Sequence, residues 1–340
     1  MITADDPALM IDTSGTTGRS KGALLTHHNL VSNIVTLLQC WQWTAADRFL
    51  LALPMFHIHG LGNGLHGALA SGCTTFLLPR GDIDAVILAL HPKHSIDIAI
   101  EFLRNNKGVL DEKPLAVTLE DGRRLADVVA QSSSPYQIGF VFRYCETVRR
   151  IAKFADRIGS PAIYSVGIFD ELLDRENTEH YNRMQQILRE SSAVNHEGSH
   201  VFDFRRLWND AEVVDVHATA VQTRTEFDGP NLWSVQQQLA DGSALRLQIG
   251  WLLPAIPSST VQIEGPGGTL YVALSNGRGI FDAGDGPKQV EMTPMAQAWD
   301  RQLDAFAHAL DTGEVTGATI ENGLAALTEA QACSVAARRT

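Results

Sequence analysis

The sequence predicts an α/β fold followed by an α+β fold, and three observations support this. Between residues 84 and 115 an apolar run, a helically spaced run and a second apolar run follow one another, as in a parallel strand-helix-strand unit. After residue 160, short alternating runs are separated by turns rich in Gly, Pro and Asp. The chain has 340 residues with 44% hydrophobic and 19% charged side chains, a globular composition that allows about two domains.

The strand-helix-strand unit predicts where a ligand binds. Residues 84–90 form an apolar run typical of a buried strand, and residues 95–105 carry apolar side chains at helical spacing. Gly108 ends that helix, and the next strand begins at Val109. Lys113 therefore lies at the carboxyl end of the second strand, where open α/β sheets bind their ligands.

This order of residues, with Pro92 after the first strand and Glu112-Lys113-Pro114 after the second, resembles the Gfo/Idh/MocA family of NAD(P)-dependent oxidoreductases. The resemblance runs from residue 81 to the C-terminus. It implies a Rossmann-like parallel sheet, NAD or NADP as cofactor, and Lys113 in contact with both the nicotinamide and a substrate hydroxyl. It also places Pro92, Glu112 and Pro114 beside the cofactor. From the residues alone, Glu-Lys-Pro could equally be a polar turn before a helix, because proline suits the first helical turn.

The next elements are a helix over residues 118–131 and a strand over residues 136–142 that ends at Arg143. The resemblance implies that Arg143 lies near cofactor and substrate, since the family often has Arg or Asn there. The alternative is an Arg that forms an ion pair. A basic amphipathic helix over residues 148–158 is expected to present its charges to solvent.

The remaining chain is expected to be strand-rich and to end in two helices, over residues 294–310 and 319–337, with Trp299, Leu303, Phe306 and Leu310 on one face of the first. This pattern fits the open antiparallel sheet of the family. The resemblance implies a substrate pocket on one face of that sheet and a homo-oligomer through the other. The expected strands cover residues 162–169, 213–222, 232–239, 244–251, 260–264 and 269–274.

Residues 196–200 match the zinc-binding pattern H-E-x-x-H. Gly198-Ser199 is a poor helix interior and no third ligand is evident, so no metal is expected. The oxidoreductase resemblance instead makes His200 the acid/base that exchanges a proton with the substrate hydroxyl. His196 stands where the inositol-dehydrogenase type has Asp. The catalytic candidates are thus Lys113, His200 and His196, and the alternative is that His200 caps or packs a helix over residues 202–208.

Residues 1–80 show a different pattern. A short strand, a loop rich in Ser, Thr and Gly, and a helix over residues 26–38 follow one another. Such a loop offers hydroxyls and free N–H groups to polyphosphate. It resembles the phosphate-binding loop of the AMP-forming acyl-CoA synthetases, and residues 53–60 resemble the next motif of those enzymes. ATP with Mg is therefore the alternative ligand, and a flexible Gly/Ser turn is the alternative structure. The candidate phosphate-loop residues are Thr13, Ser14, Gly15, Thr16, Thr17, Gly18 and Lys21.

The later synthetase motifs are absent, and so is the first half of the oxidoreductase Rossmann domain, with its Gly-rich turn. The N-terminal segment could complete the parallel sheet, or the chain could be a non-catalytic chimera. Residues 62–67 match G-x-G-x-x-G, with Asp82 downstream, but residues 54–60 separate them from the preceding strand, so no dinucleotide turn is expected here. His57, His59 and His66 lack Cys or carboxylate at ligand spacing, and we expect them to be buried or to line a pocket.

The charge supports this division and narrows the partners. The net charge is -12, which argues against nucleic acid, while residues 1–80 are neutral, with Arg and Lys balancing Asp. We therefore expect segments 1–80, 81–160 and 161–340. The four cysteines are far apart, which indicates a reducing compartment. No apolar run reaches about 18 residues and no leader pattern is present, so a cytoplasmic protein with a small-molecule substrate is expected.

Overall fold

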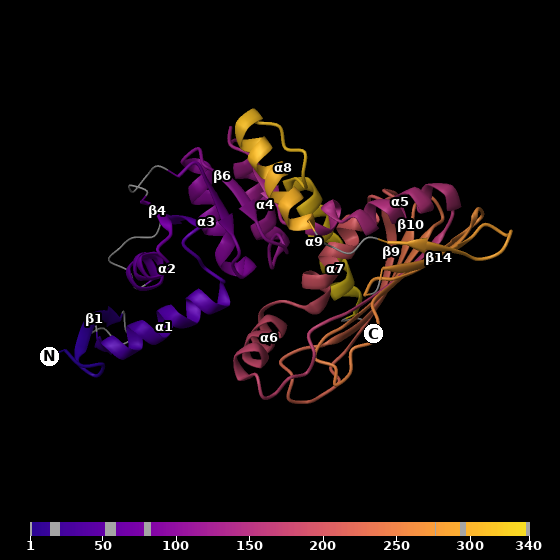
Figure 1. Cartoon of the computed structure of the whole chain (residues 1–340). Coiled ribbons are helices and arrows are strands. Elements are labelled where there is room, and N and C mark those ends of the chain that lie inside the picture. Colours follow the sequence, from indigo (N-terminus) through magenta and orange to yellow (C-terminus); the bar gives the residue numbers. More distant parts are fainter. Residues whose placement is uncertain are drawn as a thin grey trace. The chain divides into compact units, whose positions relative to one another are not determined.

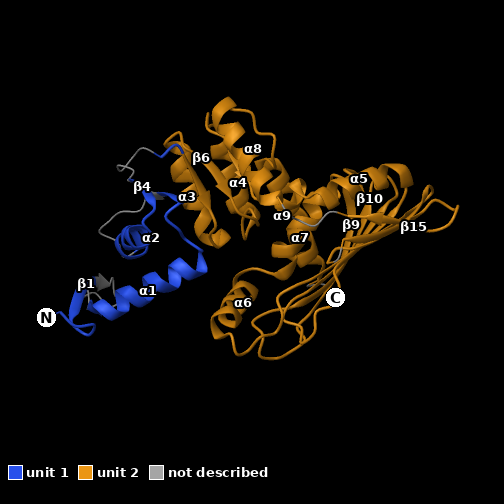
Figure 2. Ribbon diagram, viewed as in Figure 1, with its two compact units in different colours: residues 1–84 blue, residues 85–340 orange. Residues whose placement is uncertain are grey.

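The computed structural model describes residues 2–13, 21–51, 59–77, 83–275, 277–292 and 297–337. The chain forms two compact units, residues 1–84 and 85–340 (Figure 2). The expected boundary between residues 160 and 161 stays a prediction.

The first unit contains two small sheets. Strand β1 (Pro7–Thr13) pairs antiparallel with β2 (Lys21–Thr26), and β3 (Arg48–Leu51) pairs parallel with β4 (Thr74–Leu77). Helix α1 (His27–Cys40) begins at Thr26, which forms a capping box with Asn29. The sequence predicted only one strand before this helix, so β2 was missed. Ser14, Gly15, Thr16, Thr17, Gly18 and the side chains of Thr13 and Lys21 lie outside the described residues, as does His57.

The G-x-G-x-x-G segment is helical, which excludes a dinucleotide turn there. A π-helix (His59–His66) runs into the short helix α2 (Gly67–Ser71). A Cβ atom on Gly64 would lie 2.5 Å from Leu51 Cδ1, and one on Gly67 would lie 2.6 Å from Trp43 Cζ3. These glycines therefore permit close packing inside the first unit.

The second unit begins with a three-stranded parallel sheet in the order β5-β6-β7. Its strands are β5 (Ala85–Leu88), β6 (Gly108–Asp111) and β7 (Tyr136–Ile138), connected by α3 (Pro92–Arg104) and α4 (Leu119–Val129). The predicted strand-helix-strand unit is confirmed. Helix α3 begins earlier than predicted because Pro92 occupies its first turn and His91 caps it by accepting from the Lys93 N–H.

Strand β7 is shorter than predicted. It ends at Ile138, and a 3-10 helix (Val141–Tyr144) follows, so Arg143 lies on this short helix rather than at the end of a strand. Helix α5 (Glu146–Ile158) comes next and agrees with the predicted basic amphipathic helix.

The large sheet has eight strands in the order β15-β14-β13-β12-β8-β11-β10-β9. It was expected to be antiparallel, but β8 and β11 pair in parallel, so the sheet is mixed. Helices α6 (Thr178–Glu190) and α7 (Ala193–Arg205) follow β8, and such a long connection permits a parallel neighbour. The sequence missed α6, β14 and β15. The strands are β8 (Ile163–Phe169), β9 (Val213–Val221), β10 (Leu232–Leu239), β11 (Ala244–Gly250), β12 (Thr260–Gly265), β13 (Gly268–Ala273), β14 (Arg278–Asp282) and β15 (Lys288–Glu291).

Two helices close the chain, α8 (Ala298–Thr312) and α9 (Ile320–Ala337). Of the four apolar residues expected on one face of α8, Phe306 is buried, while Trp299 is 53% and Leu303 45% exposed. Helix α9 lies between α4 and the large sheet and contacts α7 and β9 (Figure 1). Within the described residues, no helix combines the length and apolarity that a membrane crossing requires.

A buried carboxyl holds the parallel sheet to its first helix. Asp111, at the end of β6, is 1% exposed, and it accepts hydrogen bonds from the Ser95 hydroxyl on α3 and the Tyr136 hydroxyl on β7 at 3.2 Å. Burial raises the pKa of Asp111 to about 7, although both hydrogen bonds oppose the shift.

Replacement of this group should change how stability depends on pH. Between about pH 4 and pH 7 the unfolded chain loses the Asp111 proton while the folded chain keeps it, so the free energy of unfolding falls as pH rises and levels off above about pH 7. The Asp111→Asn side chain cannot ionise. The difference in melting temperature between Asp111→Asn and the wild type should therefore shift in favour of the variant as pH rises from about 4 to about 7. Thermal unfolding at a series of pH values measures this, with the exposed Asp127→Asn on α4 as control. Parallel curves for Asp111→Asn and wild type would contradict the assignment.

Candidate functional site

The carboxyl end of β6 meets helix α7. The Lys113 ammonium, 18% exposed, donates to the backbone oxygen of His196 at 3.2 Å and to Glu197 Oε1 at 3.2 Å. The structure therefore brings together Lys113 and the histidine helix, which are 83 residues apart in the sequence.

Helix α7 is continuous through Gly198-Ser199, where the sequence predicted an interruption. Ser192 caps its start by accepting from the Asn195 N–H at 3.1 Å. A Cβ atom on Gly198 would lie 3.0 Å from Phe202 Cε2, so close packing favours glycine within this helix. Because they are four residues apart on one helix, His196 and His200 point from the same face.

Both histidines are buried and neutral. His196 Nε2 and His200 Nδ1 are inaccessible to solvent and have no hydrogen-bond partner among the described residues. Burial, and secondly the Lys113 charge, lower the pKa of His196 to about 3 and that of His200 well below its ordinary value. The His196 ring lies near Trp251 and His91, with ring centroids 5.8 and 6.3 Å apart, and the His200 ring is edge-on to Phe142 at 4.6 Å.

The residues that the resemblance assigns to the cofactor lie at the carboxyl ends of β5 and β6. Pro92 is buried in the first turn of α3, and Pro114 is buried after Lys113. The Glu112 N–H donates to Leu88 O at 2.9 Å, which joins the two strand ends. Burial raises the pKa of Glu112, and the neighbouring Lys113 opposes the shift.

Arg143 forms an ion pair. Its Nε donates to both carboxylate oxygens of Asp203, at 3.0 and 2.8 Å, and its Nη2 donates to one of them at 2.8 Å. Asp203 is 1% exposed and lies on α7, three residues after His200. The pair therefore holds α7 against the 3-10 helix. Contact of Arg143 with a cofactor stays a prediction.

Three site residues were missed from the sequence: His91, Glu197 and Trp251. Glu197 lies between the two candidate histidines in the sequence, and His91 directly precedes Pro92. Their closeness in sequence to predicted site residues was the signal that could have identified them. Trp251 follows β11, and no local pattern connects it with α7.

A lysine ammonium beside two neutral imidazoles can polarise an oxygen atom and accept its proton, which is the requirement of general acid/base chemistry. In the part of the chain that the structure describes, no three His, Cys, Asp or Glu side chains form a metal-binding group.

Two family models match the chain. Residues 74–140 match the Gfo/Idh/MocA model, described as an oxidoreductase family with an NAD-binding Rossmann fold, and residues 1–100 match that of the AMP-binding enzymes. Both resemblances drawn from the sequence are thereby confirmed.

The relatives found by sequence are CoA ligases, and they cover only the N-terminal segment. A malonate–CoA ligase of Arabidopsis thaliana is 42% identical over 82 residues, which is 24% of this chain and 14% of the ligase. An indoleacetate–CoA ligase of Aromatoleum aromaticum is 44% identical over 84 residues, 25% of this chain and 16% of that enzyme. The chain therefore spans a small part of the length of the ligases that it matches.

Solved structures similar in fold are oxidoreductases. An oxidoreductase from Agrobacterium radiobacter, in complex with NAD+, L-tartaric acid and magnesium, matches with a TM-score of 0.68 at 15% identity, over 87% of this chain and 97% of its own. A UDP-N-acetylglucosamine 3-dehydrogenase from Acidithiobacillus ferrooxidans matches with a TM-score of 0.68 at 16% identity, over 86% and 97%. These likenesses confirm the predicted fold class of a Rossmann-like parallel sheet followed by a large sheet.

The electrostatic influence of Lys113 on the histidines can be measured directly. Lys113→Met removes the positive charge, so the pKa values of His196 and His200 should rise towards the ordinary value while remaining lowered by burial. NMR titration of histidine-labelled protein tests this, and Lys153→Met, at an exposed position of α5, is the control. Histidine titrations that are identical in wild type and Lys113→Met would show that this charge does not act on the pair.

Proposed function

We propose that this chain is an NAD(P)-dependent oxidoreductase that acts on a hydroxyl group of a sugar, a polyol or a related compound. The observation that carries the proposal is the contact of Lys113 with α7, beside the buried histidines at positions 196 and 200. The match of residues 74–140 to an NAD-binding oxidoreductase family supports it.

The residues present fit the nicotinamide end of such a cofactor. Buried polar atoms without partners, His196 Nε2 and His200 Nδ1, lie in the part of the fold where the carboxyl ends of the parallel strands bind ligands. The described residues of the first unit contain no Gly-rich turn that could bind the pyrophosphate of the cofactor. Strands β1 and β2 form a hairpin, and Gly62 and Gly64 lie within a helix. Pro92, Glu112, Lys113 and Pro114 would therefore hold the nicotinamide end, and Arg143 would lie nearby.

Lys113 would orient the substrate. An ammonium group has three protons, and two of them are directed to His196 O and Glu197 Oε1, so the third can bind the substrate oxygen. His200, neutral because its pKa is lowered, would accept the hydroxyl proton. His196 would hold a second polar group of the substrate. The bound nicotinamide supplies hydride transfer, and the protein supplies position and charge.

Removal of Lys113 should separate binding from chemistry. Lys113→Ala is expected to lower NAD-linked turnover by about 100-fold to 10,000-fold, the usual share of a positioned acid/base group, because the substrate oxygen loses its donor. Energy transfer from tryptophan to NADH or NADPH first measures cofactor binding, and a panel of sugars and polyols then measures turnover. Lys153→Ala is the matched control. Unchanged turnover in Lys113→Ala would contradict the proposal, as would the lack of saturable binding of either cofactor to the wild type.

The proposal includes a homo-oligomer formed through the large sheet. Val214, Tyr271 and Ile280 are exposed on strands of this sheet, and apolar side chains on a sheet face favour association. Light scattering on Ile280→Lys tests the oligomer, which should dissociate because an ammonium group would be buried in an apolar contact. An unchanged mass would place the contact elsewhere.

A second candidate function is ATP binding by the loop of residues 13–21, followed by acyl-CoA ligase chemistry. The specific observation in its favour is the match of residues 1–100 to AMP-binding enzymes. Lys21→Ala should weaken ATP binding because the loop loses one of its two positive charges, and calorimetry with Mg-ATP measures this, with Arg48→Ala as the control. Equal affinity in wild type and Lys21→Ala would leave the loop without this role.

A further inference from the structure

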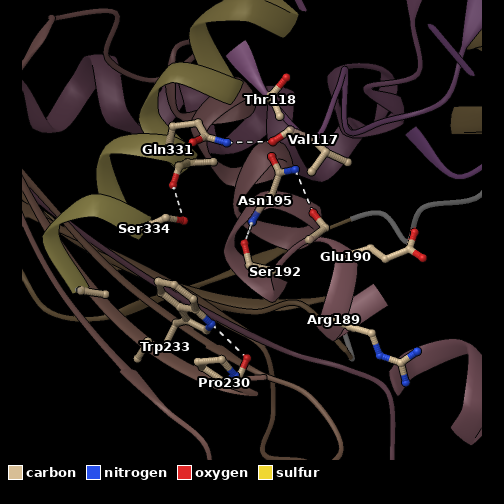
Figure 3. A pocket seen from close by; sticks show the side chains of 14 residues that line it. Val117, Thr118, Arg189, Glu190, Ser192, Asn195, Pro230, Trp233, Gln331 and Ser334 are labelled. Atoms are coloured by element: carbon tan, nitrogen blue, oxygen red, sulfur yellow. Dashed lines mark hydrogen bonds between the residues drawn. The ribbon is translucent and has the colours of Figure 1, made fainter. Parts of the chain in front are cut away.

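A second pocket lies in the larger unit, apart from the Lys113 cluster. Its volume is about 520 Å³, within the range of small-molecule sites. It lies where the start of α7, the end of α6, helix α9 and strands β9 and β10 meet (Figure 3). Its described lining includes none of Lys113, His196 and His200.

Hydroxyl and amide groups line this pocket with both donors and acceptors. The Ser191 hydroxyl accepts from Asn195 Nδ2 at 3.1 Å and the Ser192 hydroxyl from the Asn195 N–H at 3.1 Å, so each can still donate its proton. Gln331 donates its Nε2 to Val117 O at 2.8 Å, which leaves Oε1 as its acceptor. Ser334 donates to Ala330 O at 3.1 Å and presents oxygen lone pairs. A hydroxylated ligand matches this set because each hydroxyl donates and accepts.

Two charged side chains, Arg189 and Glu190, lie in the lining of this pocket. Arg189 is paired, since it donates to Asp228 Oδ2 at 2.6 Å. Glu190 accepts from Gln186 at 3.4 Å with one oxygen, while its other oxygen is buried and has no hydrogen-bond partner among the described residues, because the nearby His91 Nδ1 accepts from the Lys93 N–H. An anionic ligand would therefore find no unpaired positive charge in this lining, and the unpartnered Glu190 oxygen can accept from a hydroxyl group of a neutral ligand.

Trp233 provides an apolar wall. It is 5% exposed, and its Nε1 donates to Pro230 O at 3.2 Å, so its polar atom is already satisfied and the ring contributes carbon surface (Figure 3). Sugar rings and cyclic polyols combine an apolar C–H face with peripheral hydroxyls, and they complement an aromatic ring surrounded by hydroxyl and amide groups.

We propose that this pocket binds a neutral polyhydroxylated small molecule, a sugar or a cyclic polyol, at a site separate from the reaction centre. Two hydrogen bonds connect the pocket wall with the segment that follows Lys113. Asn195 Nδ2 donates to Ala116 O at 3.0 Å, and Gln331 donates to Val117 O. The pocket wall is therefore in direct contact with the segment that follows Lys113.

Ligand-observed saturation-transfer NMR on the full chain without nicotinamide cofactor tests the site. The probes are D-glucose, myo-inositol and sucrose, with glucose 6-phosphate as the charged comparison. Ser334→Phe fills the pocket. Thr328→Phe is the matched control, because Thr328 is an exposed residue of the same helix whose hydroxyl likewise donates to the carbonyl oxygen four residues earlier. Ser334→Leu is the smaller filling variant for use if the phenylalanine disturbs folding, as judged by thermal unfolding.

We expect saturable binding of at least one neutral probe, retained in Thr328→Phe and Lys113→Ala and lost in the folded Ser334 variant. Binding that is lost in Lys113→Ala but kept in the Ser334 variant would assign it to the reaction centre and overturn the inference. Equal or tighter binding of glucose 6-phosphate would overturn the neutral assignment, and absence of binding by every probe would overturn the site. None of these results depends on NADH binding. A failure of the proposed oxidoreductase activity would appear in the cofactor-binding and turnover measurements and can therefore be distinguished from a failure of this site.

Discussion

The contact of Lys113 with helix α7 is the interaction on which the site depends. It joins the end of β6 to a helix that follows the first strand of the large sheet, and so connects the two sheets of the larger unit. Two further interactions hold the last turn of the same helix: Arg143 binds Asp203, and Arg205 binds Glu329 of α9 at 2.9 Å. Because α7 is held both at the Lys113 contact and in its last turn, it can keep two imidazoles unsolvated beside an ammonium group.

The sequence predicted the elements whose patterns are local. Residues 84–115 showed apolar runs and helical spacing, and the strand, helix and strand were found where expected. The predicted Lys113 and His200 were also brought to one region. The partner of Arg143 could not be predicted from the sequence, because Asp203 is 60 residues away and no local pattern connects the two residues.

Tertiary packing explains the principal errors. Gly198-Ser199 has low helix propensity, yet α7 continues through it because the helix is buried along nearly its whole length, and a Cβ atom on Gly198 would lie 3.0 Å from Phe202 Cε2. Trp299 and Leu303 have helical spacing, but spacing alone does not tell which face meets a neighbour, and the buried residues of α8 are Ala298, Gln302, Phe306 and Ala309. The alternation of side chains predicts a strand but not the direction of its neighbour. The parallel pairing of β8 with β11 depends instead on the path of the chain after α6 and α7.

The ion pair between Arg205 and Glu329 also has a consequence for synthesis of the chain. Its partners are separated by 124 residues, and Glu329 lies on the last helix. During translation α7 leaves the ribosome before α9 has been synthesised. The Arg205 guanidinium therefore has no Glu329 carboxylate to pair with until α9 is made. The burial of α7 is therefore completed only when the final helix docks. Newly made chains that end before α9 should keep α7 hydrated and open to chaperones.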